Sequence, residues 1–238
     1  MKLTILMYHK VDELHAGVRY PGNFVSPALF ERQMDALLLW GYRTITLDQW
    51  LDYRDGRLDR LPSKPLILTF DDGYTCFDEH AWPILKPRGL RATVFLVASE
   101  IGGWNSWDRA EMRLPLLGAE RIRALQDEGV HFGSHGFSHV PLAKVEPARA
   151  LDELTRSRAA LTDVLRRDVT ALAYPFSNQD ARVRRLAEQA GYRCAVRGKG
   201  RMNWRWTDPF GLRRIKMDNS VTVPRLKRVL LRERYLRV

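Results

Sequence analysis

The fold depends on one stretch of the chain, Pro65-Leu66-Ile67-Leu68-Thr69-Phe70-Asp71-Asp72-Gly73. Its apolar run predicts a buried strand, which ends in two adjacent carboxylates and a glycine. Adjacent like charges at the end of a buried strand are costly unless a metal ion or a shared proton neutralises them. Asp72 is therefore a candidate metal ligand and Asp71 a candidate proton carrier. The alternative is a hairpin turn, because Asp-Gly between two β-prone runs is a common turn sequence.

Short apolar runs alternate with helical patterns along nearly the whole chain. Besides the quoted stretch, we expect strands at 3–8, 43–47, 92–98, 130–134, 169–174, 192–196 and 212–217. We expect helices at 26–41, 48–53, 77–86, 119–127, 148–165 and 180–190, and a basic helix in 218–238. This alternation favours an α/β fold with a largely parallel sheet closed into a barrel. The 238 residues suit a single domain of this kind.

The composition is that of a globular protein, with 45% apolar and 28% charged residues. The N-terminus has no signal-peptide pattern, and no stretch is long and apolar enough to span a bilayer. The two cysteines, Cys76 and Cys194, do not form a disulfide framework and are interpreted as reduced thiols. We therefore expect a cytoplasmic protein, either free or peripheral at the inner membrane face.

The formal net charge of +11 favours polyanionic partners. Near the C-terminus, helical spacing places Arg225, Arg228 and Arg232 on one face and Leu226 and Leu230 on another. One interpretation is a helix resting on an anionic membrane surface. The interpretation we favour is a last helix that packs its leucines on the body. Nucleic acid is not an expected partner, because the basic residues are spread over many helices without a recognition motif.

Five polar residues follow predicted strands directly. In (β/α) barrels the chemistry lies where strands end at their C-terminal side, and this is the position of Asp71, Asp72, His9, His135 and His139. Two imidazoles and one carboxylate, with a position left for water, form a common catalytic metal site. A shared position at the strand ends weakens the hairpin alternative for the opening stretch.

Three motifs in order carry a resemblance to a known family. Thr69-Phe70-Asp71-Asp72-Gly73, His135-x-x-x-His139 and Tyr174-Pro175-Phe176 resemble polysaccharide deacetylases of the NodB-homology type, carbohydrate esterase family 4. The resemblance covers 3–217, and the segments 6–9 and 208–215 are similar to the branch of poly-N-acetylglucosamine deacetylases. It implies a distorted (β/α) barrel and a metal-dependent enzyme that hydrolyses the N-acetyl group of an amino sugar.

The resemblance also implies roles for individual residues. Asp72, His135 and His139 would hold a divalent metal, usually zinc, with Co²⁺, Ni²⁺, Fe²⁺ or Mn²⁺ as alternatives. Asp71 would be the general base, and the backbone N–H of Phe176 would contact the developing oxyanion.

The sequence departs from the family pattern at three places. Most members carry the general acid in a Leu-x-His motif near the C-terminus, but no histidine follows Met217. In the exopolysaccharide branch this histidine comes from an N-terminal Tyr-His, so the resemblance implies that His9 is the general acid. The alternative is a histidine that closes the strand end by hydrogen bonding. Ala173 stands where most members have the arginine that orients the base, and Arg214 is our candidate replacement. Gly136 stands where many members have Ser or Thr, and we expect this change to loosen the loop that carries the metal ligands.

The expected partner is a glycan or glycolipid that contains an amino sugar, and a lipid- or nucleotide-linked precursor suits a basic cytoplasmic protein. One alternative is deformylation or hydrolysis of another N-acyl group by the same mechanism. Another is a sugar-binding barrel without a metal or turnover. Four tryptophans in predicted loops either stack on sugar rings or pack internally: Trp104, Trp107, Trp204 and Trp206.

Overall fold

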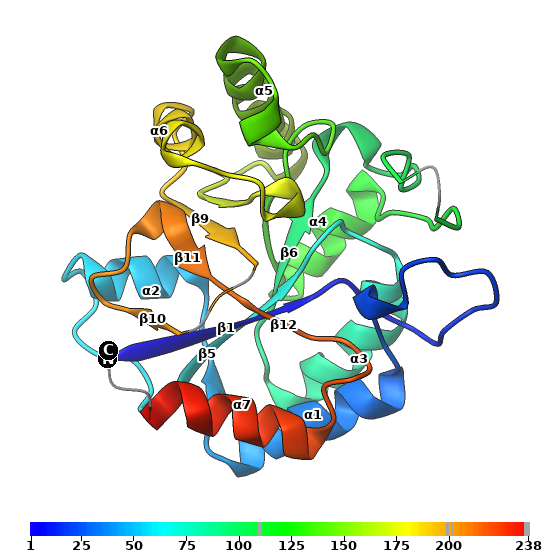
Figure 1. The fold of residues 1–238 in the computed structure, drawn as a ribbon, viewed down its shortest axis with the longest axis vertical. Coiled ribbons are helices and arrows are strands. Elements are labelled where there is room, and N and C mark those ends of the chain that lie inside the picture. Colours follow the sequence, from blue (N-terminus) through cyan, green and yellow to red (C-terminus); the bar gives the residue numbers. More distant parts are fainter. Residues whose placement is uncertain (109–110, 199, 201, 236–238) are drawn as a thin grey trace.

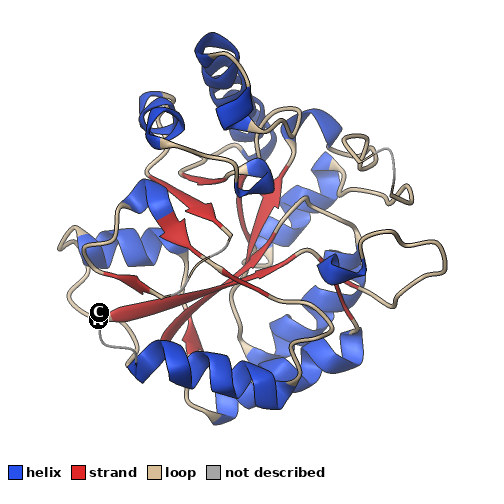
Figure 2. Cartoon of the chain, in the orientation of Figure 1, coloured by secondary structure: helices blue, strands red, loops and turns tan. Residues whose placement is uncertain are grey.

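A computed structural model describes residues 1–108, 111–198, 200 and 202–235 of the chain. Strands lie at the centre of the molecule and helices surround them, as Figures 1 and 2 show. The α/β fold expected from the alternating pattern is therefore confirmed.

The described part of the chain forms strands, helices and short helical turns. The strands are β1 (Lys2–Tyr8), β2 (Lys10–Val11), β3 (Phe24–Val25), β4 (Arg43–Thr44), β5 (Pro65–Phe70), β6 (Thr93–Leu96), β7 (His131–Ser134), β8 (Ala171–Ala173), β9 (Cys194–Arg197), β10 (Asn203–Trp204), β11 (Leu212–Arg213) and β12 (Ile215–Lys216). The helices are α1 (Pro27–Leu39), α2 (Leu47–Arg54), α3 (Trp82–Leu85), α4 (Ala119–Asp127), α5 (Pro147–Leu165), α6 (Ala181–Gln189) and α7 (Val223–Tyr235). Short helical turns lie at Pro21–Asn23, Phe77–Ala81, Lys86–Arg88, Ala98–Glu100, Leu142–Lys144, Pro175–Ser177 and Pro209–Gly211.

The main sheet runs in the order β10-β1-β5-β6-β7-β8-β9-β11, and all neighbours except β10 and β1 are parallel. In the β1–β5 pair, Tyr8 lies opposite Phe70. His9 and Asp71 therefore leave the sheet at the same edge. The parallel pairing of β5 excludes the hairpin alternative for the opening stretch.

The barrel closes through a broken strand. The expected continuous strand 212–217 is wrong, because β11 and β12 are separated at Arg214. β11 pairs with β9 and β12 pairs with β1, so the two pieces join the last parallel strand to the first. Arg214 lies at this break, its N–H still donates to the carbonyl oxygen of Arg197, and its side chain is buried inside the barrel.

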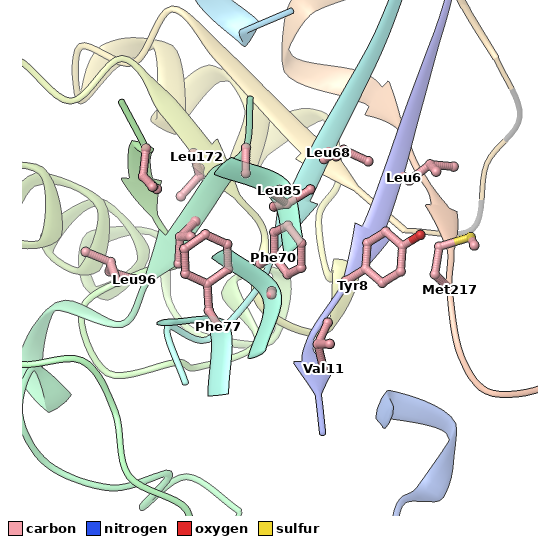
Figure 3. Packing of buried hydrophobic residues seen from close by; sticks show 14 of the residues in the cluster. Leu6, Tyr8, Val11, Leu68, Phe70, Phe77, Leu85, Leu96, Leu172 and Met217 are labelled. Atoms are coloured by element: carbon pink, nitrogen blue, oxygen red, sulfur yellow. The ribbon is translucent and has the colours of Figure 1, made fainter. Parts of the chain in front are cut away.

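Alternate residues of the central strands enter two apolar clusters. Even-numbered residues such as Leu6 and Tyr8 belong to the larger cluster, which includes the helices, whereas Leu3 and Ile5 belong to the second. Figure 3 shows the larger cluster around Phe70, whose ring lies 5.3 Å from that of Tyr8 and 4.8 Å from that of Phe77. This alternation turns Asp71, two residues beyond Thr69, toward the barrel interior.

Several local predictions need correction. The strand expected at 43–47 covers only β4, because the side chain of Thr46 caps α2 by accepting a hydrogen bond from the Gln49 N–H. The helix expected at 77–86 is divided into a wide turn at Phe77–Ala81 and the short α3, which has Pro83 in its first turn. The helix expected at 119–127 is confirmed as α4.

The C-terminal helix α7 lies beside α1 (Figure 1). Leu226 and Leu230 are buried, while Arg225, Arg228 and Arg232 are exposed. The apolar face is thus used in packing, as in the interpretation we favoured. Both cysteines are free, buried thiols. Among the described residues, no helix combines the length and apolar character needed to cross a membrane.

Candidate metal centre

The strand ends of the barrel meet in one cleft of ≈ 390 Å³. It is lined by six of the seven residues singled out from the sequence: His9, Asp71, Asp72, His135, His139 and Phe176. The seventh, Arg214, lies behind Asp71 and lines an adjoining hollow. Residues that are up to 167 positions apart in the chain, from His9 to Phe176, therefore share one site.

Three of these residues form a group that could hold a metal ion. One ligand atom from each of Asp72, His135 and His139 lies within 4.8 Å of the others, and all three side chains are buried. The Asp72 Oδ1 atom is 3.5 Å from Nε2 of His135 and 3.4 Å from Nε2 of His139. Tetrahedral zinc with bonds of about 2.0–2.1 Å requires ligand atoms about 3.3 Å apart. The spacing and the donor types therefore fit a divalent cation of this kind.

The backbone orients the His135 imidazole for this role. Its Nδ1 atom lies 2.8 Å from the carbonyl oxygen of Ala173, which selects the tautomer with a free lone pair on Nε2. Burial lowers the pKa of His135 to about 4, although Asp71 and Asp72 act in the opposite direction. The imidazole is thus neutral at physiological pH, as a metal ligand must be.

Strained backbone is concentrated at the cleft. Five described non-glycine residues have positive φ, and four of them line this site: Asp72, His139, Phe176 and Ser177, with φ of 77°, 57°, 56° and 56°. Such conformations cost free energy and persist only where the surroundings enforce them. Gly73 follows at φ 81°, and a side chain there would meet Leu96 Cδ2 at 2.7 Å. The turn after β5 therefore requires this glycine.

Arg214 contacts Asp71 through a two-pronged ion pair. Its Nη1 and Nη2 atoms donate to Oδ1 and Oδ2 of Asp71 at 2.6 and 2.7 Å, and Nη1 also donates to Thr69 Oγ1 at 3.1 Å. Both partners are buried. Burial by itself raises the pKa of Asp71, but the charge and the hydrogen bonds of Arg214 outweigh it and hold the pKa below its usual range. Asp71 is thus an oriented, ionised carboxylate beside the metal ligands.

His9 faces the same cleft from the end of β1. Burial lowers the pKa of its imidazole, while Asp72 and Asp71 raise it. Its Nδ1 atom is buried without a hydrogen-bond partner among the described residues. A ring without a fixed partner on Nδ1 is free to hold or release a proton at Nε2 or Nδ1 toward the cleft.

Aromatic rings enclose the third ligand. The ring centroids of Trp107 and Phe176 each lie 4.6 Å from that of His139. The Phe176 side chain is 62% exposed, so its ring forms the rim of the cleft. Trp204 and Trp206 stack on each other at 5.2 Å, and Trp204 pairs with Lys2 at the opposite end of β1. Of the described tryptophan pairs considered from sequence, only the one containing Trp107 reaches this cleft.

The loop between the two histidine ligands is held by Glu153 of α5, which sequence reasoning missed. Its carboxylate accepts hydrogen bonds from the N–H groups of Phe137 and Ser138, at 3.1 and 2.8 Å, and from the Ser138 hydroxyl at 2.5 Å. Gly136 has φ 82°, and a side chain there would lie 3.3 Å from Pro175 Cγ. The expected loosening at Gly136 is therefore offset by Glu153. In the sequence, the only sign of this role was an acidic residue next to Leu154 in a predicted helix. The structure shows that its side chain is buried.

Lys10 is a second residue of the cleft that the sequence did not single out. It follows His9 directly and is only 3% exposed. The feature of the sequence that could have drawn attention to Lys10 is its position between a candidate catalytic histidine and the apolar Val11.

Comparison with known proteins places these motifs in a family. A model of the polysaccharide deacetylase family matches residues 59–195, more than half of the chain. YxkH of Bacillus subtilis is 26% identical over 230 residues, which cover 93% of this chain and 73% of that protein. A poly-beta-1,6-N-acetyl-D-glucosamine N-deacetylase of Staphylococcus aureus is 24% identical over 161 residues, 64% of this chain and 53% of that enzyme. The match thus spans about half of the staphylococcal enzyme.

Solved structures share the fold. IcaB from Ammonifex degensii has a TM-score of 0.82 at 24% identity, with 94% of this chain and 95% of that chain covered. The Streptococcus pyogenes deacetylase PplD has a TM-score of 0.81 at 23% identity, with 96% and 98% covered. The barrel is therefore of the NodB-homology type. With the family match and these folds in agreement, the chain belongs to the polysaccharide deacetylase family.

Proposed function

We propose that the protein hydrolyses the N-acetyl group of an N-acetylated amino sugar in a glycan or glycan precursor, with a divalent metal as cofactor. The observation that carries this proposal is the adjacency of two groups in one cleft. One is the Asp72–His135–His139 triad, and the other is the carboxylate of Asp71, held by Arg214.

The three triad residues would hold the cation. Once bound, a divalent cation supplies Lewis-acid chemistry, because it lowers the pKa of water and polarises a carbonyl oxygen. The donor set suits zinc, with Co²⁺, Ni²⁺, Fe²⁺ and Mn²⁺ as further candidates.

Asp71 is the general base in this proposal. Its carboxylate takes a proton from the attacking water as the new C–O bond forms at the acetyl carbon. Arg214 keeps both carboxylate oxygens in place and keeps the group ionised. The backbone N–H of Phe176, at the rim of the cleft, is the candidate donor to the oxygen that becomes negative.

His9 is the general acid. It gives a proton to the amide nitrogen as the C–N bond breaks, so that acetate and a free amino sugar leave. A proton moves from water to Asp71 and another from His9 to nitrogen. Transfer from Asp71 back to His9 restores both residues for the next turnover.

The names of relatives support an amino-sugar substrate, because one is a deacetylase of poly-beta-1,6-N-acetyl-D-glucosamine. The acyl group, the polymer or precursor nature of the substrate, and a cytoplasmic location with or without membrane contact remain predictions. Deformylation would use the same residues, so the test compares N-acetyl with N-formyl substrates.

The test measures release of acetate from β-1,6-linked N-acetylglucosamine oligomers and from N-acetylglucosamine 1-phosphate, and compares it with release of formate from the N-formyl analogues. We expect release by the metal-loaded protein and loss of release after chelation. Asp71→Asn should lose at least about a hundredfold in kcat, because the isosteric amide cannot accept the proton. Failure of the metal-loaded protein to release acetate from any amino sugar, or full activity of Asp71→Asn, would contradict the proposal.

A further inference from the structure

Lys10 presents a nearly buried ammonium group to the catalytic cleft. Its side chain is 3% exposed and lines the same cavity as Asp71, Asp72 and the histidines. The Nζ atom lies 4.7 Å from the ring centroid of Phe24 and 4.7 Å from that of Tyr74. It makes no hydrogen bond or ion pair with any residue that the structure describes. A buried lysine is costly unless a partner compensates its charge.

The two aromatic rings compensate this charge only in part. Ring faces attract a cation, but they leave the three N–H donors of an ammonium group without strong acceptors. The direction of the side chain into a cavity, rather than into the protein core, indicates that the missing acceptor enters with a ligand.

The acidic groups near Lys10 are engaged elsewhere or remain at a distance. Glu111 accepts hydrogen bonds from three backbone N–H groups at 2.9–3.0 Å. Asp72 belongs to the metal triad. Asp108 lines the cleft but does not form an ion pair with Lys10. Burial raises the pKa of the Cys76 thiol to about 12, so this group is neutral.

Tyr74 adds a second donor to the same wall of the cleft. It is 4% exposed and lines the cavity, and its hydroxyl makes no hydrogen bond to the described part of the chain. A phenol hydroxyl carries its proton at neutral pH and can donate it to an acceptor in the cavity. An ammonium and a phenol directed to one cavity form a typical donor pair for an anionic oxygen group.

We propose that Lys10 and Tyr74 form a subsite for a negatively charged substituent, a phosphate or a carboxylate, on the amino sugar or on the group attached to it. The inference rests on the proposed function and narrows its substrate class to charged amino sugars. Lys216 lines a hollow of ≈ 350 Å³ that shares His9 with the cleft, so a second lysine borders a space next to this subsite.

The test compares three probes with the metal-loaded protein: N-acetylglucosamine 1-phosphate, N-acetylglucosaminuronate and the neutral methyl N-acetylglucosaminide. Binding is measured by calorimetry and acetate release by steady-state kinetics. Lys10→Met keeps the apolar stem between the two rings, and Tyr74→Phe removes only a hydroxyl. Lys227→Met is the matched control, because this exposed lysine also lies over a ring, that of Trp40, on the surface helix α7.

We expect wild type to prefer at least one charged probe over the neutral one. Lys10→Met should reduce binding and kcat/KM for that probe about tenfold or more, with a smaller reduction for the neutral probe. Tyr74→Phe should also reduce binding and kcat/KM for that probe, by a smaller factor. Lys227→Met should match wild type. Phosphate oxygens also bind metals directly. The decisive quantity is therefore the difference in affinity and in kcat/KM between wild type and Lys10→Met for the same probe. The carboxylate probe separates uronate from phosphate recognition.

Equal binding of charged and neutral probes by wild type would overturn the subsite. Equal losses for all probes in Lys10→Met would also overturn it, since they would indicate a packing role. If no probe releases acetate, the proposed function fails, and the binding measurements still decide whether Lys10 selects an anion.

Discussion

Arg214 takes its position from a break in the sheet. Arg214 lies between β11 and β12, where the pairing changes from β9 to β1, and from this position its side chain reaches Asp71. A guanidinium matches both oxygens of a carboxylate, whereas an ammonium can match only one position at a time. The residue therefore does two things for Asp71: it lowers the pKa and it fixes the plane of the carboxylate.

Arg214→Lys tests both effects. The pKa of Asp71 should rise toward its usual range, because the charge partner becomes more distant and loses one hydrogen bond. A base with a higher pKa is protonated over a wider acidic range, so the acid limb of the kcat/KM profile should move to higher pH. We also expect kcat to fall about tenfold to a hundredfold from misorientation. Arg213→Lys, on the exposed neighbouring residue, should leave the profile unchanged.

His9→Ala tests the general acid. We expect kcat to fall about a hundredfold or more, because the amine would leave without a proton. Metal content should stay at the wild-type level, because His9 does not belong to the triad. His15→Ala is the control, since the side chain of this exposed histidine is paired with Asp12 and does not line the cleft. Near-normal turnover of a metal-loaded His9→Ala protein would remove His9 from the mechanism.

At the scale of elements, α5 fixes the loop that carries two candidate metal ligands. Glu153 accepts hydrogen bonds from two of the three N–H groups between His135 and His139, which ties the loop to the helix. A charged acceptor makes these hydrogen bonds stronger than a neutral one would. Glu153 is thus a positioning residue, with no contact to the reacting atoms.

Glu153→Gln should weaken metal binding about tenfold to a hundredfold, in line with other supporting residues around metal ligands. Titration of the metal-free protein with Zn²⁺ measures this change directly. Asp152→Asn is the control, because this neighbouring acid on α5 is exposed. Unchanged affinity in Glu153→Gln would show that the strained backbone alone holds the loop.

The elements also show what sequence could and could not predict. Regular runs such as α4 and β6 were predicted because their apolar periodicity is local. The break at Arg214 was not, since it depends on two strands distant in sequence that compete for the pairing of one segment. Lys10 was missed for a similar reason. Its role depends on the rings of Phe24 and Tyr74, which only the folded chain brings together.

At the scale of the molecule, α7 completes the helical layer by packing against α1 (Figures 1 and 2). Leu226→Ala should lower the free energy of unfolding by about 2–5 kcal/mol, because it leaves a cavity under a fully buried side chain. Leu231→Ala, at a position that is 44% exposed, should lower the free energy of unfolding much less. Urea unfolding of both variants measures the difference. Equal effects would mean that α7 does not pack on the body in solution.

The barrel and the grouping of Asp72, His135 and His139 were predicted together because motif order and strand ends specify both. The resemblance implied an amino-sugar substrate, but not which one, because the walls of the cleft are formed by residues from separate parts of the chain, among them Lys10, Tyr74 and Trp107. Net charge indicated only a general preference for anions, whereas the buried Lys10 beside the candidate catalytic residues is the basis of the specific anion subsite that we propose.

The most direct test of the account is the metal content of the purified protein after chelation and reloading with Zn²⁺, measured by mass spectrometry of the metal. We predict about one ion per chain for wild type, and the same for Asp108→Ala, which lines the same cleft outside the triad. Asp72→Ala should lose the ion and, with it, acetate release. A wild-type chain that binds no divalent cation, or an Asp72→Ala chain that binds it as tightly, would contradict the account.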